Sequence, residues 1–310
     1  MKIVFAGSSE YAIPALKALL SSPEHNVLLV LSQPANPKGR KQKLEDTPLT
    51  IYAREQGLKV FCPQDVNSIE SVDHILGQKA DILITASYGA YLKRRLRQGF
   101  ASGAINLHPS LLPLYRGASP IRTALLNGEK LSGNTIFRIV AKMDAGPILS
   151  QETLKIEAGE NYSSLHDRLA LQAADLLIKL LPVLPDIQAQ EQDHEAATFS
   201  KKIDKQDLVL DFDRKSKSLE NQIRAYSLFP GAFAQFRDTK LKILSAEPTV
   251  SPQVFPPGHI IEIVKNNGFA ISTKDGQLLV LQVQAAGKKI MNAYSYHLGA
   301  RLQVGERIGI

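Results

Sequence analysis

The chain of 310 residues is long enough for two domains, each with its own hydrophobic core. Apolar residues make up 44% and charged residues 22%, as in an ordinary soluble globular protein, and the net charge is +7. Cys62 is the only cysteine, which excludes an intramolecular disulfide and a cysteine-based zinc site and fits a reducing compartment. Because the sequence contains neither a signal peptide nor a membrane-spanning apolar run, we expect a cytoplasmic protein with no membrane partner.

The positive charge is concentrated in the last third of the chain. Residues 201–310 hold 16 lysines and arginines against 10 acidic residues, a net charge of +6, whereas residues 1–200 have a net charge of +1. A basic domain beside a neutral one favours a polyanionic partner, with nucleic acid as the first candidate. A lysine-rich soluble surface explains the same excess, so both interpretations stay open.

The first 184 residues alternate short β-branched runs with segments of helical periodicity. This alternation predicts an α/β domain with a doubly wound parallel sheet. The predicted strands cover residues 2–6, 26–31, 59–61, 81–86, 103–108 and 135–140, and the predicted helices cover 12–20, 47–57, 69–76, 91–98, 119–126 and 161–184. The Gly-x-Gly-x-x-Gly spacing of dinucleotide-binding proteins is absent after the first strand, and we expect Ser8 and Ser9 there to cap the next helix.

Residues 33–48 form a long polar insertion after the second predicted strand. Four cations lie within six residues of it: Lys38, Arg40, Lys41 and Lys43. A loop of this length without secondary structure tends to be functional or disordered. Because it leaves the edge of the sheet where ligands bind, we favour contact with phosphates over a mobile, solvated loop.

The segment from Gly103 to Pro120 joins an apolar strand to a loop that is stiffened by three prolines. Asn106 and His108 lie two residues apart at the end of this strand, so their side chains point to the same face. They also lie at the carboxyl edge of the sheet, where open α/β sheets bind ligands. Two interpretations fit the segment: a site organised around these two side chains, or a rigid turn with a buried, hydrogen-bonded histidine.

Asp144 lies in a turn before an apolar strand, within Met143-Asp-Ala-Gly-Pro-Ile-Leu149. Aspartates in such turns usually bond their own backbone, and this local role is the expectation for Asp144 when the turn is taken alone.

Beyond residue 206 the pattern changes to short apolar runs separated by turns. The predicted strands cover residues 208–212, 232–237, 241–246, 259–264, 269–273 and 278–285, with a helix over 219–226. Asn266-Asn-Gly and Lys274-Asp-Gly are strong hairpin signals. We therefore expect a small all-β, oligonucleotide-binding-like barrel over residues 207–310, a polar linker over 189–206 and the α/β domain over 1–188.

The chain resembles the methionyl-tRNA formyltransferase family over almost its full length. The pattern shared with all 10-formyltetrahydrofolate-dependent formyltransferases is Asn106-Leu-His108, Ser110-Leu-Leu-Pro113 and Asp144-Ala-Gly-Pro. Features that resemble the tRNA enzymes in particular are Phe5-Ala-Gly, Gln33-Pro with Gly39-Arg, Arg116-Gly-Ala-Ser-Pro-Ile121, Pro257-Gly-His-Ile and Ala286-Gly-Lys-Lys289. The chain departs from the family pattern at Ser8-Ser9, Lys93, Leu114, Ser119 and Ile139-Val140.

The resemblance implies a Rossmann-like formyltransferase domain followed by a tRNA-binding barrel. It implies transfer of the formyl group of 10-formyltetrahydrofolate to the α-amino group of methionine on initiator tRNA, with no metal and no nicotinamide. We expect the Asn106 amide to stabilise the oxyanion, His108 to carry out acid–base work, and Asp144 to orient the imidazole and relay a proton. We further expect a monomer.

The resemblance also divides the binding residues between the two substrates. We expect the folate to contact Ile84, Tyr88, Gly89, Ser110, Leu111, Leu112, Pro113 and Lys142. We expect the tRNA to contact Lys38, Arg40, Lys41 and Lys43 at its acceptor end and Lys288 and Lys289 along its phosphates.

Two alternative functions remain open from the sequence. Another folate-dependent formyltransferase, acting on a nucleotide sugar or on glycinamide ribonucleotide, explains Asn106, His108 and Asp144 equally well but leaves the basic loop and basic barrel unexplained. A non-catalytic RNA-binding protein explains the charge but leaves the three chemical residues unexplained.

Overall fold

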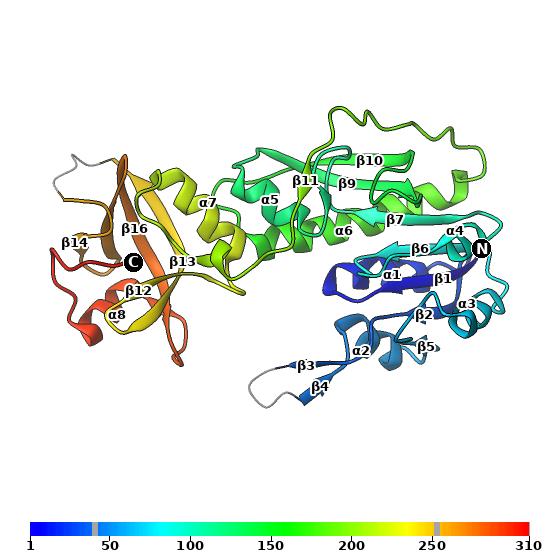
Figure 1. Ribbon diagram of the computed structural model, residues 1–310, viewed down its shortest axis with the longest axis horizontal. Helices are drawn as coiled ribbons and strands as arrows, with labels where there is room; N and C mark the ends of the chain where they lie inside the picture. Colours follow the sequence, from blue (N-terminus) through cyan, green and yellow to red (C-terminus); the bar gives the residue numbers. More distant parts are fainter. Residues whose placement is uncertain (39–42, 251–254, 310) are drawn as a thin grey trace. The chain divides into compact units, whose positions relative to one another are not determined.

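The protein was analysed as a computed structural model that describes residues 1–38, 43–250 and 255–309 (Figure 1). The chain divides into two compact units that are each built from several segments. The first unit comprises Met1–Pro120, Leu131–Lys155 and His166–Ser200, and the second comprises Ile121–Lys130, Ile156–Leu165 and Lys201–Ile310. The domain boundaries at residues 188 and 206 stay predictions.

A seven-stranded sheet forms the centre of the first unit, in the order β10-β9-β7-β6-β1-β2-β5 (Figure 1). Five strands are parallel: β1 (Lys2–Gly7), β2 (Asn26–Leu31), β5 (Val60–Phe61), β6 (Ile82–Ala86) and β7 (Ala104–His108). Two antiparallel strands, β9 (Leu131–Arg138) and β10 (Ile148–Lys155), extend the sheet beyond β7. The predicted doubly wound α/β architecture is confirmed, and β7 lies inside the sheet, with its carboxyl end at the edge where open α/β sheets generally bind ligands.

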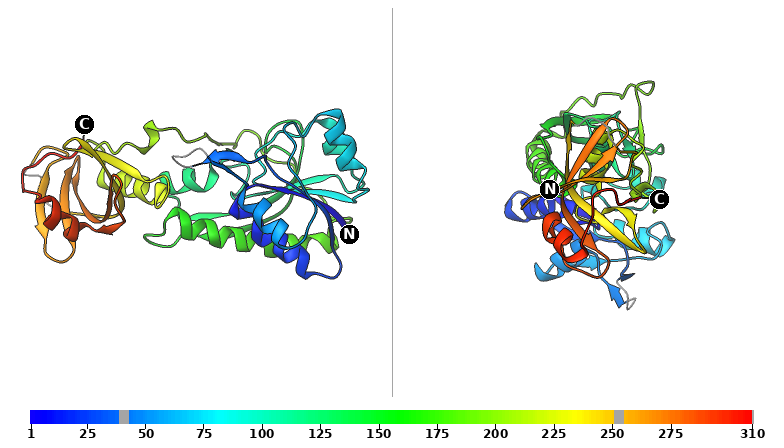
Figure 2. Two further views of the ribbon diagram at one scale, coloured as in Figure 1. Left: turned by 90° about the horizontal axis from the view of Figure 1, so that it is seen from below. Right: turned by 90° about the vertical axis from the view of Figure 1, so that its left-hand side faces the viewer.

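Helices cover both faces of this sheet (Figure 2). One face carries Val4, Leu29, Leu83 and Ala104, which pack against apolar residues of α3 (Ile69–Leu76) and α4 (Arg94–Gln98). The other face is covered by α1 (Ile13–Ser21) and α6 (Tyr162–Leu180), with α2 (Pro48–Glu55) nearby (Figure 2). Strands buried on both faces read as continuous apolar runs, and this is why the sequence predicts them well.

Three details of the first unit differ from the prediction. The polar insertion contains a short hairpin of β3 (Asn36–Lys38) and β4 (Lys43–Glu45), so it is not wholly irregular. The basic helix begins at Arg94 rather than at residue 91. The polar segment after α6 contains β11 (Phe199–Ser200), which pairs in parallel with β8 (Arg116–Gly117).

The second unit is built on an antiparallel sheet in the order β12-β13-β16-β15-β14, with β17 paired to β16. Its strands are β12 (Ala232–Phe236), β13 (Thr239–Thr249), β14 (Ile260–Val264), β15 (Gly268–Thr273), β16 (Gly276–Ala285) and β17 (Met291–Asn292). The expected all-β second domain is confirmed, and so are both predicted hairpin turns. Asn266 has a φ of +62° in the first of these turns, a conformation that Asn tolerates.

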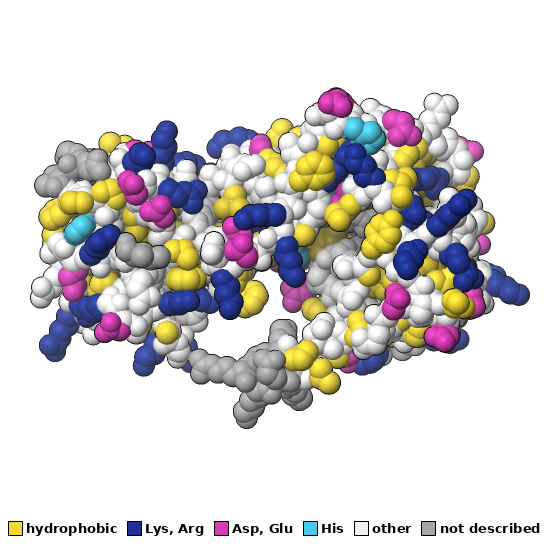
Figure 3. Space-filling model, viewed as in Figure 1, with side chains coloured by type: hydrophobic (Ala, Val, Ile, Leu, Met, Phe, Trp, Pro, Cys, Tyr) yellow, Lys and Arg dark blue, Asp and Glu magenta, His cyan; other side chains and the backbone are white. Residues whose placement is uncertain are grey.

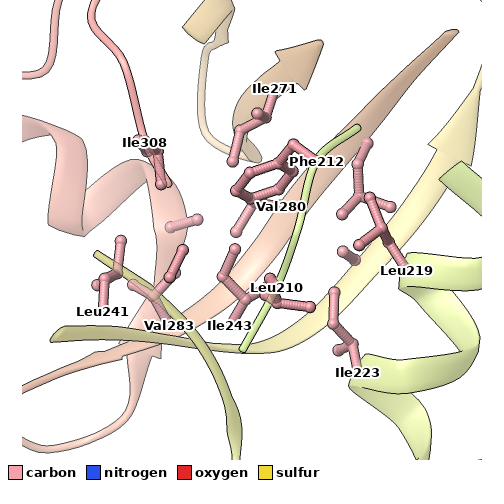
Figure 4. Close-up of a cluster of buried hydrophobic side chains, with 14 of the residues drawn as sticks. Leu210, Phe212, Leu219, Ile223, Leu241, Ile243, Ile271, Val280, Val283 and Ile308 are labelled. Atoms are coloured by element: carbon pink, nitrogen blue, oxygen red, sulfur yellow. The ribbon is translucent and has the colours of Figure 1, made fainter. Parts of the chain in front are cut away.

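The core of the second unit joins the sheet to α7 (Ser216–Tyr226) (Figure 4). Leu219 and Ile223 of α7 contact a buried cluster that includes Ile243, Ile271 and Val280 of the strands. Helix α5 (Pro120–Leu126) also belongs to this unit, because Leu126 packs against the same cluster.

One strand predicted for the second unit is wrong, and one of its helices was not predicted. Residues 208–212 are not a strand: they follow the 3-10 turn Gln206–Leu208, and only Val209 bridges to the sheet, at Phe233. Leu210 and Phe212 are nevertheless buried in the core. The sequence analysis also missed α8 (Ala293–Ala300), whose N-terminus is capped by the Asn292 side chain. None of the helices in the described residues combines the length and apolar character needed to cross a membrane.

Candidate active site

The carboxyl end of β7 carries two polar side chains on one face of the sheet, as the alternation of strand residues requires. Asn106 pairs with Phe137 of β9 and with Thr85 of β6, and His108 pairs with Thr135 of β9. His108 is 5% exposed, whereas Asn106 is half-buried. The buried, hydrogen-bonded histidine that one interpretation expects is present, and it lies beside a side chain that solvent can reach. That the two side chains organise a site stays a prediction.

The two ring nitrogens of His108 have different partners. Nε2 lies 3.0 Å from the backbone carbonyl oxygen of Tyr115. A carbonyl can only accept, so Nε2 carries a proton and donates it to this oxygen. Nδ1 faces the carboxylate of Asp144, at 3.9 Å from Oδ2. The geometry leaves Nδ1 as the nitrogen that can gain or lose a proton.

The amide of Asn106 is oriented by Thr85, a residue that the sequence analysis did not single out. The buried Thr85 hydroxyl lies 2.5 Å from Asn106 Oδ1 and donates to it. The same hydroxyl is 3.3 Å from the carbonyl of Ile105. With Oδ1 engaged, the amide nitrogen of Asn106 is directed away from Thr85 as a donor.

Asp144 occupies the connection between β9 and β10 with a φ of +50°, an uncommon conformation for a residue other than glycine. Its Oδ2 atom accepts a hydrogen bond of 2.7 Å from the backbone N–H of Gly117, 27 residues away in the chain. The expected turn position is confirmed, but the carboxylate bonds a distant loop instead of acting only within its own turn. The same oxygen faces His108, so one carboxylate connects the turn, the loop and the imidazole.

Two residues outside the predicted site support the turn that carries Asp144: Gln192 bonds its backbone, and Arg116 bonds Gln192. Gln192 donates from Nε2 to the carbonyls of Asp144 (3.0 Å) and Gly146 (2.6 Å). Its Oε1 accepts from Nε (3.1 Å) and Nη2 (2.6 Å) of Arg116. Burial lowers the pKa of Arg116, although the nearby Asp144 carboxylate acts in the opposite direction. The only sequence signal for Gln192 was its place in a polar segment, which gave no indication of its partners.

The residues predicted to bind folate fall into two groups. Four are buried: Ile84, Tyr88, Ser110 and Leu112. Among these, Ser110 Oγ donates to the carbonyl of Leu114, and burial raises the pKa of Tyr88 well above its ordinary value. Four have exposed or partly exposed surface: Gly89, Leu111, Pro113 and Lys142. The exposed group lies on the segments that follow β6, β7 and β9.

A hydrogen bond brings two of these segments together. The Tyr91 hydroxyl donates to the carbonyl of Ala141 at 3.1 Å, so the segment after β6 lies against the connection that carries Lys142 and Asp144. Gly89 has a φ of +80°, and apart from Gly89 and its two neighbours in the chain, no described residue has an atom within 4 Å of the place where a side chain would begin. The backbone there is open to a ligand.

Ser8 joins the ends of three strands, and the predicted capping by Ser8 and Ser9 is wrong. Ser8 Oγ donates to the Tyr88 carbonyl (3.1 Å) and accepts from Gln33 N–H (3.2 Å). Ser9 precedes the first helical turn without a side-chain cap bond. The serine at position 8 therefore acts in joining β1, β2 and β6 rather than in starting a helix.

The predicted tRNA contacts lie in both units. Lys38 is the last residue of β3 and Lys43 is the first residue of β4. Arg40 and Lys41 lie outside the described residues. Lys288 and Lys289 are exposed in the turn between β16 and β17, where Lys288 N–H donates to Ala285 O. On the face shown in Figure 3, basic side chains are interspersed with acidic ones in both units.

Two family descriptions match the chain. Formyl transferase matches residues 1–181, and Formyl transferase, C-terminal domain, matches residues 202–301. The chain is 38% identical over 313 residues to the methionyl-tRNA formyltransferase of Kosmotoga olearia, with 100% of each chain covered. It is 33% identical to that of Bacillus subtilis, with 100% of this chain and 98% of the relative covered.

Solved structures share the fold at low identity. An N-formyltransferase from Helicobacter canadensis, in complex with folinic acid and dTDP-3-aminofucose, is 21% identical with a TM-score of 0.65, covering 92% of this chain and 99% of that one. HypX from Aquifex aeolicus, in complex with tetrahydrofolic acid, is 17% identical with a TM-score of 0.60, covering 99% of this chain and 48% of that one.

Proposed function

This chain belongs to the methionyl-tRNA formyltransferase family, and we infer that it is a formyl-transferring enzyme of translation initiation. It transfers the formyl group of 10-formyltetrahydrofolate to the α-amino group of methionine on initiator tRNA. The observation that carries the chemistry is the meeting of His108 Nδ1 and Asp144 Oδ2 beside the half-buried Asn106 amide. A cytoplasmic location and a monomeric state stay predictions.

We propose that proton transfer uses Nδ1 of His108. The attacking amine nitrogen forms a bond to the formyl carbon and loses a proton, and the folate nitrogen gains a proton as its bond to that carbon breaks. Nε2 keeps its proton for the Tyr115 carbonyl, so Nδ1 is the atom that takes and returns the transferred proton. Proton transfer by a positioned side chain contributes about 10²–10⁴-fold. The Asp144 carboxylate would stabilise the ring while it carries the extra proton.

We propose that Asn106 stabilises the oxyanion of the tetrahedral intermediate. An amide N–H₂ donates without regard to pH, and a preorganised donor of this kind contributes about 10²–10³-fold. Thr85 supports this role because its bond to Oδ1 leaves the nitrogen side of the amide for the substrate.

We propose that the folate contacts the surface between the segment after β6 and the connection after β9. The open backbone at Gly89, the exposed Lys142 and the bond from Tyr91 to Ala141 support this placement. Leu111 and Pro113 add partly exposed apolar surface. The buried Ile84, Tyr88, Ser110 and Leu112 would act by shaping this surface from beneath.

We propose that the tRNA is held by the basic loop and the barrel. Lys38, Arg40, Lys41 and Lys43 would meet the acceptor end, and the exposed Lys288 and Lys289 would contact phosphates. The net charge of +6 in residues 201–310 supports a role of the second domain in affinity rather than in chemistry.

A formyl-transfer assay tests the function. The full chain is incubated with 10-formyltetrahydrofolate and one of four acceptors: methionyl initiator tRNA, methionyl elongator tRNA, a dTDP-linked amino sugar or glycinamide ribonucleotide. We expect rapid transfer only to the initiator tRNA. Preferred transfer to the sugar or the ribonucleotide would replace this function with the related activity, and tRNA binding without transfer would identify a non-catalytic RNA-binding protein.

A further inference from the structure

We propose that Gln192 is a positioning residue of the formyl-transfer site, which it serves by fixing the turn that presents Asp144. The proposal rests on the function proposed above for its effect on catalysis. Gln192 comes from the segment after α6, and its side chain spans the gap between two other elements, β8 and the β9–β10 connection. It is 6% exposed, so substrate contact is not the basis of its role.

The orientation of the Gln192 amide is dictated by its partners. Arg116 has only donors, and the carbonyls of Asp144 and Gly146 have only acceptors. The amide therefore fits in one way: Oε1 receives two N–H groups of Arg116, and Nε2 donates one hydrogen to each carbonyl. Every hydrogen-bonding group of this side chain is used, which is the condition for a rigid buried polar network.

The turn needs external support because of its backbone. Asp144 has a positive φ of +50°, and a non-glycine residue keeps this conformation only when its surroundings hold it. Gly146 follows two residues later, and a side chain there would begin 1.8 Å from the carbonyl oxygen of Arg138. Gln192 bonds the carbonyls of both Asp144 and Gly146, so it holds this crowded turn at two points.

Arg116 connects the network to the other partner of the carboxylate. The residue after Arg116 is Gly117, whose N–H donates to Asp144 Oδ2. Gln192 thus bonds the backbone carbonyl of Asp144 and also Arg116, whose neighbour Gly117 orients the Asp144 carboxylate. Arg116 is 1% exposed, and its Nη1 atom has no hydrogen-bond partner within the described residues. Its bonds to Gln192 and His194 Nδ1 therefore hold the guanidinium in place.

The substitution Gln192→Glu separates the two halves of the network. A glutamate keeps the Oε1 acceptor for Arg116 and pairs with its charge, but it replaces the Nε2 donor with an oxygen that repels both carbonyls. Gln190→Glu is the matched control, since Gln190 is exposed on the same segment and uses its backbone, not its side chain, to bridge Ile148.

Two measurements on the full chain test the proposal. Hydrogen exchange of the Gly117 amide, followed by NMR, reports the bond to Asp144 without any assay of activity, and we expect it to accelerate about 10-fold or more in Gln192→Glu alone. We also expect kcat to fall about 10–100-fold with both KM values within about twofold, because small displacements of a catalytic group cost this much. The Gln190→Glu control should match the wild type in both.

A double-variant cycle distinguishes positioning from general damage. If Gln192 acts through Asp144, Gln192→Glu should lower kcat much less in an Asp144→Ala background than in the wild type. Unchanged exchange at Gly117, equal losses in both backgrounds or a loss confined to KM would overturn the proposal. If Gln192→Glu does not fold, Arg116→Lys provides the same test with a smaller expected loss, and an inactive wild-type chain would refute the proposed function while the exchange result still decides the positioning.

Discussion

Nδ1 of His108 lies 3.9 Å from Oδ2 of Asp144, while the other nitrogen of the same ring is committed to the Tyr115 carbonyl at 3.0 Å. The distance to the carboxylate is too long for a hydrogen bond of ordinary length. A neutral ring with its proton on Nε2 presents a lone pair toward Asp144, and a charged ring presents an N–H. The carboxylate therefore faces the one ring nitrogen that has no backbone partner among the described residues.

The first prediction concerns the three chemical side chains. We expect kcat to fall by about 10²-fold or more in each of three variants: Asn106→Ala, His108→Ala and Asp144→Ala. The first removes the proposed oxyanion donor, the second the proton carrier, and the third the charge that stabilises that carrier. Single-turnover formylation measures the loss, and circular dichroism checks that folding is retained. Asp186→Ala, at an exposed aspartate of the same unit, is the control, and near-normal turnover in any of the three variants would remove that residue from the mechanism.

The second prediction concerns Thr85, which is buried and donates to Asn106 Oδ1. Thr85→Val keeps the shape but removes the hydroxyl, so the Asn106 amide loses its orientation. We expect kcat to fall about 10-fold with little change in KM, and Thr85→Ser to recover most of the activity because the hydroxyl returns. A normal kcat in the Val variant with a loss in the Ser variant would show that the threonine acts through packing alone.

The third prediction concerns the basic loop. Arg40→Ala should raise the KM for tRNA at least several-fold and leave the KM for folate nearly unchanged, because a cation that meets phosphates affects only the polyanionic substrate. Steady-state kinetics with each substrate varied in turn measures both constants. Lys17→Ala removes one exposed charge from α1 and should change neither. A change in the folate KM alone would assign the loop to the other substrate.

The fourth prediction concerns the barrel. The double variant Lys288→Ala/Lys289→Ala should bind tRNA more weakly, and its log–log salt dependence should be shallower by about 1.4–1.8 if both lysines touch phosphates. A salt titration of tRNA binding measures the slope. Lys17→Ala/Lys59→Ala makes the same change in net charge at exposed sites of the first unit. Identical slopes for the two double variants would leave the barrel lysines as a soluble surface.

The fifth prediction concerns Asp207 in the second unit. Burial acts to raise the pKa of this carboxyl, but the Asp204 N–H and the Lys201 ammonium together outweigh it, and the net pKa lies below the usual value. A carboxyl whose pKa is lowered by folding stabilises the protein above the unfolded pKa of about 3.9, and this contribution is lost as pH falls through the folded pKa.

Asp207→Asn should therefore lower the Tm by a few degrees at pH 7, and the difference from wild type should shrink as pH falls from about 5 to 2. Thermal melts across this range measure it. Asp238→Asn, at an exposed aspartate of the same unit, should match the wild type throughout. A difference that stays constant with pH would mean that the substituted amide disturbs packing rather than removing a favourable charge.

The sequence predicts the scaffold of the site better than its contacts. Strand β7 and the shared face of Asn106 and His108 follow from apolar runs and the two-residue period of strands. The bond from Gly117 to Asp144 joins residues 27 apart, and nothing periodic marks either one. Thr85 and Gln192 are similar cases, because a hydrogen-bond partner on a neighbouring element can be identified only when the topology is known.

The wrong strand and the unpredicted helix of the second unit have a related cause. Leu210 and Phe212 are buried, but burial in a core does not require a strand. Among the described residues, the Leu210 N–H donates to the carbonyl of Phe233, and no ladder of bonds follows from it. In α8, Tyr294 and Tyr296 favour strand by propensity, whereas packing of Ala293 in the core and capping by Asn292 favour helix. Tertiary contacts decide the outcome in both segments.

The pairing of β11 with β8 has a consequence for how the enzyme is made. A ribosome releases Asn106, His108 and Asp144 before it releases the segment from Gln190 to Ser200, which bonds the site loop through Gln192 and Thr198. Domains fold in order as they are synthesised, so the nascent α/β sheet can form while the turn of Asp144 still lacks its support. If Gln192 acts as proposed, a chain that terminates near residue 188 would contain Asn106, His108 and Asp144 but would lack the bonds from Gln192 and Thr198 that complete the site.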